Sequence, residues 1–237
     1  AGAQECHPVP NGARPAGRGV RLEASVVAAR FDLAGAAGDY QGVSGAGQWL
    51  IGRVGFGVQV PAYRIRRLSG TSVGIGDVGV TAQWTLLDRG AASGEAGVGT
   101  HAHHDHHEHM LMSGTPDDAP AAATLRAGLA TSVTLPTGDR DRGAGMGHVM
   151  IMPGVWGAAA RGRWSVTVTA SWGQAIGAAG AHQHGALGPV VHPMNRSELA
   201  GTVRAAVRFG AGVDVHASMS AATPLAEGGV VRATGEV

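Results

Sequence analysis

Residues 163–172 read Arg-Trp-Ser-Val-Thr-Val-Thr-Ala-Ser-Trp, an unbroken alternation of polar and apolar side chains. A period of two is typical of a β-strand, because successive side chains point to opposite faces. One face of this stretch is apolar and ends in two tryptophans, and the other carries hydroxyl groups. A run of about ten residues is the length that a tilted strand needs to cross a bilayer, whereas most strands of soluble proteins have about five or six residues.

The same alternation recurs along the chain and predicts ten strands, at 19–31, 40–51, 54–66, 74–86, 124–136, 148–159, 163–176, 197–209, 212–223 and 228–237. Short turns are expected at 52–53, 161–162 and 210–211, and longer links at 32–39, 67–73, 137–147 and 177–196. Alternating connection lengths are typical of outer-membrane barrels. The pattern therefore predicts an all-β, antiparallel up-and-down transmembrane β-barrel of about ten strands, with twelve as the alternative. We expect residues 1–18 to form a periplasmic N-terminal segment and residues 19–237 to form the barrel, with a His-rich loop insert at 88–123.

The composition supports a β-sheet with one face in lipid. Charged residues make up 15% of the chain, against about 25% in soluble domains. The sequence contains no run of about 18 apolar residues, so it predicts no transmembrane helix. The net charge of +1 gives no reason to expect nucleic acid as a partner. A start at Ala1-Gly2-Ala3 fits a chain whose signal peptide has been removed, so we expect the bacterial outer membrane, in a Gram-negative envelope. A soluble β-sandwich or lectin-like barrel is the alternative.

Aromatic residues gather near one set of predicted strand ends, where a girdle at the headgroup level belongs. These residues are Trp49, Phe56, Trp84, Trp164 and Phe209. The opposite girdle is thin, with Trp172 and either Phe31 or Tyr63 as its candidates.

Two short blocks resemble a known family. Gly74-Ile75-Gly76-Asp77 opens one predicted strand, and Leu135-Pro136-Thr137-Gly138-Asp139 closes the next. Their order and spacing are similar to those of outer-membrane transporters in the meta-pathway phenol-degradation family. The resemblance implies an outer-membrane barrel with a transport-related role. This chain departs from the family where a His-rich insert replaces the short link between the two blocks.

The insert contains six histidines within nine residues. Imidazole suits Zn, Cu and Ni, and the methionines that follow the histidines favour Cu(I). We therefore predict a flexible metal-binding loop, periplasmic by the strand count and on the same side as Cys6 and His7. Its candidate ligands are His101, His103, His104, Asp105, His106, His107, Glu108 and His109. The alternative is a solvated polar loop whose histidines bind nothing.

A second candidate site lies on the strand that begins at His148. His148, Met150 and Met152 share one face, and Met146 precedes them in register. We expect this face to point into the barrel, where the four side chains would form a path for a soft ion such as Cu(I). Ordinary packing of Met in an irregular interior is the alternative.

Other polar residues on the predicted inner faces carry both signs of charge, and we expect them to pair with one another and fill a narrow interior. They are Arg21, Glu23, Asp77, Gln83, Arg126, Arg204, Arg208 and Asp214.

No enzymatic activity is expected. The stretch His101-x-His103-x-Asp105-His106 matches a metallo-β-lactamase motif, but such a match arises easily in a tract this rich in His and Asp. Neither H-E-x-x-H nor G-x-S-x-G occurs.

The sequence thus predicts an outer-membrane barrel with a lipid bilayer and a transition metal (Cu or Zn, then Ni) as its partners, acting in metal transport, efflux or tolerance. The alternatives are a structural or interaction barrel within an envelope complex, where the His-rich loop docks a protein partner, and a passive channel for small apolar solutes.

Overall fold

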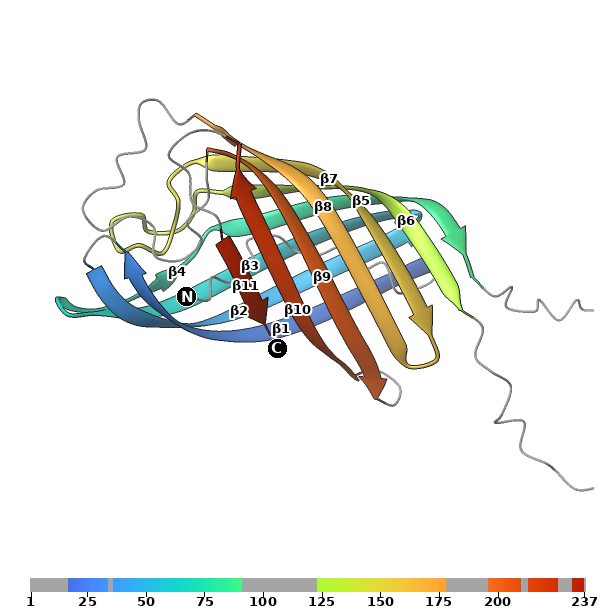
Figure 1. Cartoon of the computed structure of the whole chain (residues 1–237), viewed down its shortest axis with the longest axis horizontal. Coiled ribbons are helices and arrows are strands. Elements are labelled where there is room, and N and C mark those ends of the chain that lie inside the picture. The colour runs from blue at the N-terminus through green and yellow to red at the C-terminus, as the bar shows by residue number, and fades with distance from the viewer. Residues whose placement is uncertain are drawn as a thin grey trace, which may run out of the picture.

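A computed structural model describes residues 17–33, 36–90, 123–177, 196–209, 213–225 and 232–236. These residues form eleven strands and no helix (Figure 1). No helix among them is long and apolar enough to cross a membrane. The strands are β1 (Gly17–Leu33), β2 (Ala36–Gly52), β3 (Val54–Arg67), β4 (Gly70–Ile75), β5 (Val78–Arg89), β6 (Thr124–Leu135), β7 (Val149–Arg161), β8 (Trp164–Ile176), β9 (Ser197–Phe209), β10 (Val213–Pro224) and β11 (Arg232–Glu236).

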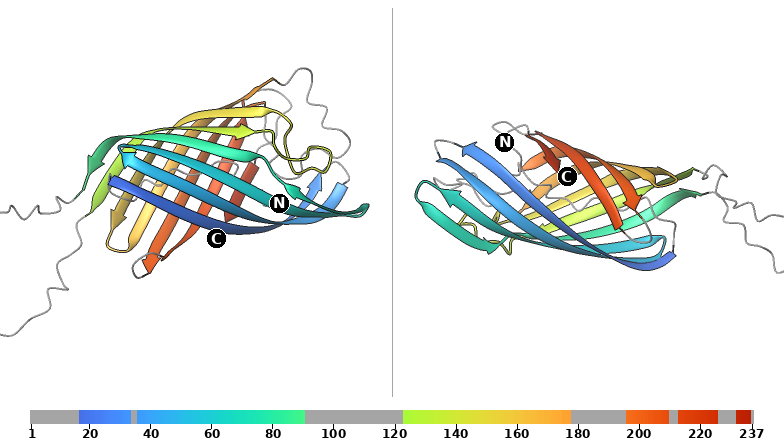
Figure 2. Two further views of the ribbon diagram at one scale, coloured as in Figure 1. Left: turned by 180° about the vertical axis from the view of Figure 1, so that it is seen from behind. Right: turned by 90° about the horizontal axis from the view of Figure 1, so that it is seen from below.

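All strands belong to one antiparallel sheet, in which strands pair with their neighbours in the chain except that β4 and β5 both pair with β3. The order is β1-β2-β3-β5-β6-β7-β8-β9-β10-β11, and β4 pairs with β3. The sheet curls into a half-barrel (Figure 2). Within the described residues, no backbone pairing joins β1 to β10 or β11. A closed barrel was expected from the sequence, and the described sheet is open along this side.

The two ends of the half-barrel differ. The turn end carries the tight β2–β3 and β7–β8 turns, where Gly52 and Gly162 adopt positive φ. The opposite end, here the loop end, carries the β6–β7 connection. The predicted links 32–39 and 67–73 at the loop end are wrong. Strands β1 and β2 pair as far as Leu33↔Ala36, and β3 and β4 as far as Arg67↔Gly70.

The strand predicted at 74–86 is interrupted at Gly76 and Asp77, which separate β4 from β5. Strand β3 pairs with both parts, at Ala62–Arg67 for β4 and at Val54–Gln59 for β5. A Cβ on Gly76 would collide with the ring of Tyr63, so only glycine fits this position. The interruption turns the Asp77 side chain toward the β6–β7 connection, where it accepts backbone hydrogen bonds.

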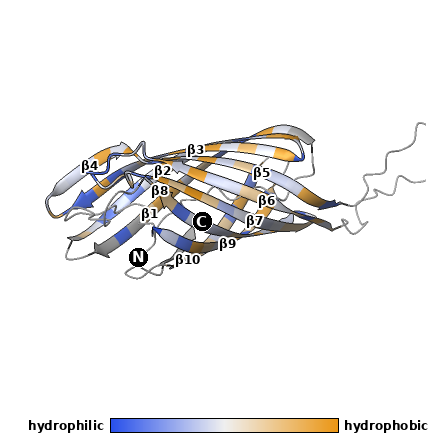
Figure 3. Ribbon diagram, turned by 90° about the horizontal axis from the view of Figure 1, so that it is seen from above, coloured by the Kyte–Doolittle hydropathy of each residue, from blue (hydrophilic) through white to orange (hydrophobic). Residues whose placement is uncertain are grey.

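Hydrophobic and hydrophilic residues alternate along the strands (Figure 3), and the burial of their side chains shows that the two faces of the sheet differ as the alternation predicted. The outer face is apolar along most strands, and many of its large side chains are exposed, among them Leu22, Val26, Trp84, Val168, Leu199 and Val215. The inner face carries glycine, alanine, hydroxyl and charged residues, many of them buried.

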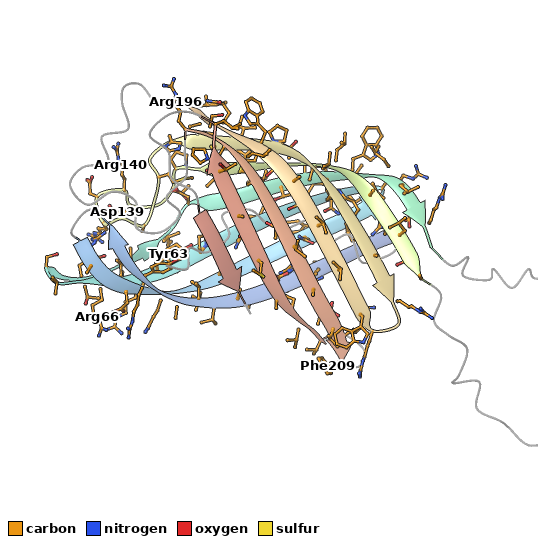
Figure 4. The ribbon with its side chains drawn as sticks, in the orientation of Figure 1. Tyr63, Arg66, Asp139, Arg140, Arg196 and Phe209 are labelled. Atoms are coloured by element: carbon orange, nitrogen blue, oxygen red, sulfur yellow. The ribbon has the colours of Figure 1, made fainter. Side chains whose placement is uncertain are left out.

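Near the loop end, the inner face holds a small core of Tyr40, Tyr63, Ile65 and Ala144. The rings of Tyr40 and Tyr63 meet edge to face, with centroids 6.2 Å apart. Tyr63, labelled in Figure 4, is therefore buried inside and does not belong to an outer girdle. Ala144 brings the β6–β7 connection into the same core.

Candidate functional site

The inner face of the half-barrel holds three groups of charged, polar or sulfur-containing side chains. The group nearest the turn end is charged and connects β1 with β9 and β10. Arg204 Nη2 lies 2.5 Å from Glu23 Oε1. Arg21 lies 3.5 Å from Glu23 and 3.8 Å from Asp214, and Arg208 Nε lies 3.0 Å from Asp214. The prediction that inner charges of opposite sign pair with one another is confirmed for these residues.

His216 belongs to the same group. Its Nε2 lies 2.6 Å from Arg204 Nη2. A guanidinium can only donate hydrogen bonds, so Nε2 must accept this one, which requires a neutral imidazole with its proton on Nδ1. His216 therefore acts here as an acceptor within an ion-paired network.

A second group lies on β5, β6 and β7, at the base of the His-rich insert. The guanidinium of Arg126 is 5.9 Å from the centroid of the Trp156 ring. Arg126 Nε lies 3.4 Å from Asp88 Oδ2, and its Nη2 donates to Thr85 Oγ1 at 3.3 Å. Trp156 Nε1 donates to the carbonyl oxygen of Leu129 at 3.1 Å. Because Asp88 and Arg126 are close to the ends of β5 and β6, their ion pair fixes the two strand ends between which the insert runs.

The third group is the predicted row of Met and His side chains on β7 and on the residues just before it. Met146, His148, Met150 and Met152 are all buried on the inner face, so their predicted orientation is confirmed. Met150 is 0% exposed. Met146, Met150 and Met152 pack in one cluster with Ala175 of β8, Ala200 of β9 and Ala222 of β10. Their role as metal ligands stays a prediction.

Glu198 of β9 joins this third group. It is 0% exposed, and its Cγ lies 3.2 Å from the place that a Cβ on Gly173 would occupy. Glu198 was not among the site residues predicted from the sequence. The alternation did contain the signal, because Glu198 shares the face of Arg204 and Arg208 on the same strand. What the alternation could not show is that β7 and β9 bring Met150 and Glu198 to the same glycine of β8.

The β6–β7 connection, residues 136–148, covers the inner face at the loop end and leads directly into the row. Both carboxylate oxygens of Asp77 hold it: Oδ1 accepts from Gly138 N at 2.8 Å and Oδ2 from Met146 N at 2.6 Å. Thr137 adds two more contacts, accepting from Val78 N at 2.9 Å and donating to the Gly76 carbonyl at 3.1 Å. The two sequence blocks that suggested a family resemblance are thus in direct contact.

The His-rich tract lies outside the described residues. This applies to His101, His103, His104, Asp105, His106, His107, Glu108 and His109, and also to Cys6 and His7. What the structure does fix is where the tract is attached: β5 ends at Arg89 and β6 begins at Thr124, both at the turn end. Within the described part of the chain, no three His, Cys, Asp or Glu side chains are grouped as metal ligands.

Comparison with protein-family models gave no match, and a search of curated proteins gave none either.

Proposed function

We propose that this chain is an outer-membrane β-barrel that binds a transition metal through its His-rich loop and acts in metal transport, efflux or tolerance. The observation that carries the metal assignment is the buried row of Met146, His148, Met150 and Met152 on the inner face, in a chain that also contains six histidines within nine residues. Imidazole and thioether are ligands for borderline and soft metals.

The outer face supports the membrane location. Exposed Val, Leu and Trp side chains cover it on strand after strand, while the charged residues of the inner face pair with one another. In water, such an extensive apolar surface would promote aggregation, whereas in a bilayer it would face the acyl chains. Trp49, Phe56, Trp164 and Phe209 lie exposed near the turn end, where they would form one aromatic girdle.

The two metal-binding regions would have separate roles. The loop attached at the turn end would capture metal with its imidazoles, on the periplasmic side in this arrangement. The inner row lies toward the loop end and would hold the ion within the wall. The ion pairs between Arg21, Glu23, Arg204 and Asp214 occupy the interior between these regions, which argues against free passage of large solutes.

Metal content and affinity test this proposal. The protein is purified in detergent without an affinity tag, analysed for metal, and titrated with Cu(II), Zn(II) and Ni(II), with and without residues 99–112. We expect near-stoichiometric metal that is lost with the insert. Binding no tighter than that of a free peptide with the sequence of residues 99–112 would refute the role of the loop.

An interaction barrel in an envelope complex is the second candidate. It is favoured by the open side of the sheet, since an unpaired strand edge readily accepts another strand, and β1 is paired only to β2 within the described residues. Deletion of 99–112 separates the two candidates. Loss of metal tolerance with an intact fold supports metal handling, and loss of a co-purifying protein supports the interaction barrel.

A further inference from the structure

We infer that Arg30, Arg64 and Arg66 form a binding site for the headgroup phosphate of an anionic membrane lipid, on the outer face of the sheet at the loop end. Arg30 belongs to β1 and the other two to β3, and Asp39 of β2 lies between the strands. The inference rests on the proposed membrane location, to which it adds the class of lipid that the outer face binds.

The pairing of β1, β2 and β3 brings the three arginines into one patch. Arg30 lies directly opposite Asp39, and Asp39 lies directly opposite Arg66. Arg64 precedes Arg66 by two residues on the same face of β3. Directly opposed residues have Cβ atoms about 5 Å apart, and residues two positions apart on a strand are about 7 Å apart. The long arginine side chains can therefore reach one headgroup together.

The patch continues the apolar outer face of the same strands. All three arginines are exposed, and they alternate in phase with the exposed Val26 of β1 and Val60 of β3. Arg66, labelled in Figure 4, points away from the interior of the half-barrel. A lipid whose acyl chains cover the apolar part of these strands would thus carry its headgroup to the arginines.

The height of the patch fits a headgroup. Phe56, near the turn end, and Arg64 both face outward on β3, and the stretch between them is about 27 Å long at ~3.4 Å per residue. At a strand tilt of about 40° this spans about 20 Å across the bilayer, close to the ~25 Å height of a barrel's apolar band. If Phe56 marks one interface, the guanidinium groups lie at the other, because long arginine side chains extend toward the headgroups.

The charge of the patch favours an anion. Its three guanidinium groups outnumber its carboxylate, which pairs with Arg66 at 2.7 Å. Within the part of the chain that the structure describes, no carboxylate forms an ion pair with Arg30 or Arg64. A phosphate can bind these two arginines without displacing a partner, and guanidinium groups bind phosphate oxygens with paired hydrogen bonds. The patch therefore complements an anionic phosphate, whereas the cation of a zwitterionic headgroup would be repelled.

Lipid binding in detergent tests the site. Native mass spectrometry measures the affinity of the purified protein for phosphatidylglycerol, which is anionic, and for phosphatidylcholine with the same acyl chains, which is zwitterionic. We expect phosphatidylglycerol to bind more tightly. The double variant Arg30→Gln, Arg64→Gln should bind phosphatidylglycerol at least tenfold more weakly, since each basic residue near an anionic lipid contributes about fivefold. It should bind phosphatidylcholine within twofold of the parent.

Two further variants show whether the position of the charge matters. The matched control, Arg53→Gln with Arg161→Gln, removes the same charge from exposed side chains at two different turns of the turn end, and it should change phosphatidylglycerol affinity less than twofold. Asp39→Asn removes the carboxylate of the patch and should strengthen phosphatidylglycerol binding several-fold. Circular dichroism of each variant in detergent confirms that the sheet has formed.

Two results would overturn the site. Equal loss of phosphatidylglycerol affinity in the two double variants would mean that net charge alone attracts the lipid. Displacement of phosphatidylglycerol by millimolar inorganic phosphate at constant ionic strength would mean that the arginines bind free phosphate and not a lipid.

The membrane proposal is tested separately, by quenching of Trp84 and Trp164 with brominated lipids. If both are quenched while the variant lacking Arg30 and Arg64 binds phosphatidylglycerol as tightly as its parent, the membrane location holds and the arginine site is refuted. If neither is quenched but phosphatidylglycerol binding still depends on the two arginines, the membrane-spanning function fails and the lipid site stands.

Discussion

At the scale of the residue, Asp77 joins two segments of the chain at the loop end. A single carboxylate holds the β6–β7 connection at two points, Gly138 and Met146. Carboxylate oxygens accept two backbone N–H groups without competition, because an ionised carboxylate is only an acceptor. Met146 is thus placed by its backbone while its side chain enters the methionine cluster.

Replacing Asp77 with Asn should release this connection. The Asn amide can accept at its oxygen, but its NH2 group would face one of the two backbone donors and leave that donor unsatisfied. An unsatisfied buried donor costs about 1–3 kcal/mol. We expect faster hydrogen exchange at the amides of Gly138 and Met146, measured by NMR or mass spectrometry. Asp141→Asn, at an exposed position of the same connection, is the control, and equal exchange in both variants would show that Asp77 does not anchor the segment.

The face of the sheet to which a single side chain points was the property best predicted from the sequence. The period of two is local, so it predicted that Met150 and Val149 point to opposite faces. It did not predict which residues from distant strands meet. Tyr63 was a candidate for an outer girdle because aromatic residues favour such positions. It lies an odd number of positions from the outward-facing Phe56 on β3, so it points to the inner face, where its ring meets Tyr40. The convergence of Met150 and Glu198 on Gly173 depends on the pairing register of β7 with β8 and of β8 with β9, which no local pattern encodes.

At the scale of the element, strands β2 and β3 show why two links were predicted longer than they are. The segment 36–39 is rich in Gly and Ala and reads as a loop. In the sheet it pairs with the end of β3, where Asp39 lies directly opposite Arg66 and the two side chains form an ion pair at 2.7 Å. Cross-strand pairs of this kind stabilise a ladder, so the strands continue through the small residues.

The ion pairs of β1 lead to a second prediction. Removing one partner of a fully buried pair costs about 3–5 kcal/mol and removing one of an exposed pair about 0–1 kcal/mol. Glu23 is partly buried, so we expect Glu23→Gln to lower the free energy of unfolding by about 1–3 kcal/mol, because the charge of Arg204 stays inside. Asp39→Asn, which breaks the exposed pair with Arg66, should cost less than about 1 kcal/mol.

Urea unfolding in detergent, followed by tryptophan fluorescence, measures both variants. Equal destabilisation by Glu23→Gln and Asp39→Asn would mean that the inner network does not hold β1 against β9 and β10.

At the scale of the whole molecule, the difference between the two faces is the property that bears on the membrane proposal. The tryptophans provide a direct probe of it, since Trp49, Trp84, Trp164 and Trp172 are exposed on the outer face and Trp156 is 3% exposed on the inner face. All five tryptophans of the chain are thus assigned to a face by the structure.

Variants that keep one tryptophan and carry Phe at the other four are reconstituted in bilayers with brominated lipids, which quench nearby indole fluorescence. We expect strong quenching for Trp84 and Trp164, because their rings would face lipid, and little for Trp156. Lack of quenching at Trp84 and Trp164, with Trp156 unchanged, would place the outer face away from the acyl chains and refute the membrane proposal.

The ion pair between Glu23 and Arg204 joins residues 181 positions apart, whereas each ladder of the sheet joins strands that are adjacent in the chain or nearly so. Contacts between distant residues carry a larger loop-closure entropy and form more slowly than local ones. Assembly should therefore proceed from hairpin to hairpin along the chain, and the curl should be fixed only after β9 has joined the sheet. Until then, the inner charges of β1 would have no partners. Strand β1 would therefore gain its ion pairs to Arg204 and Asp214 only after β9 and β10 have joined the sheet.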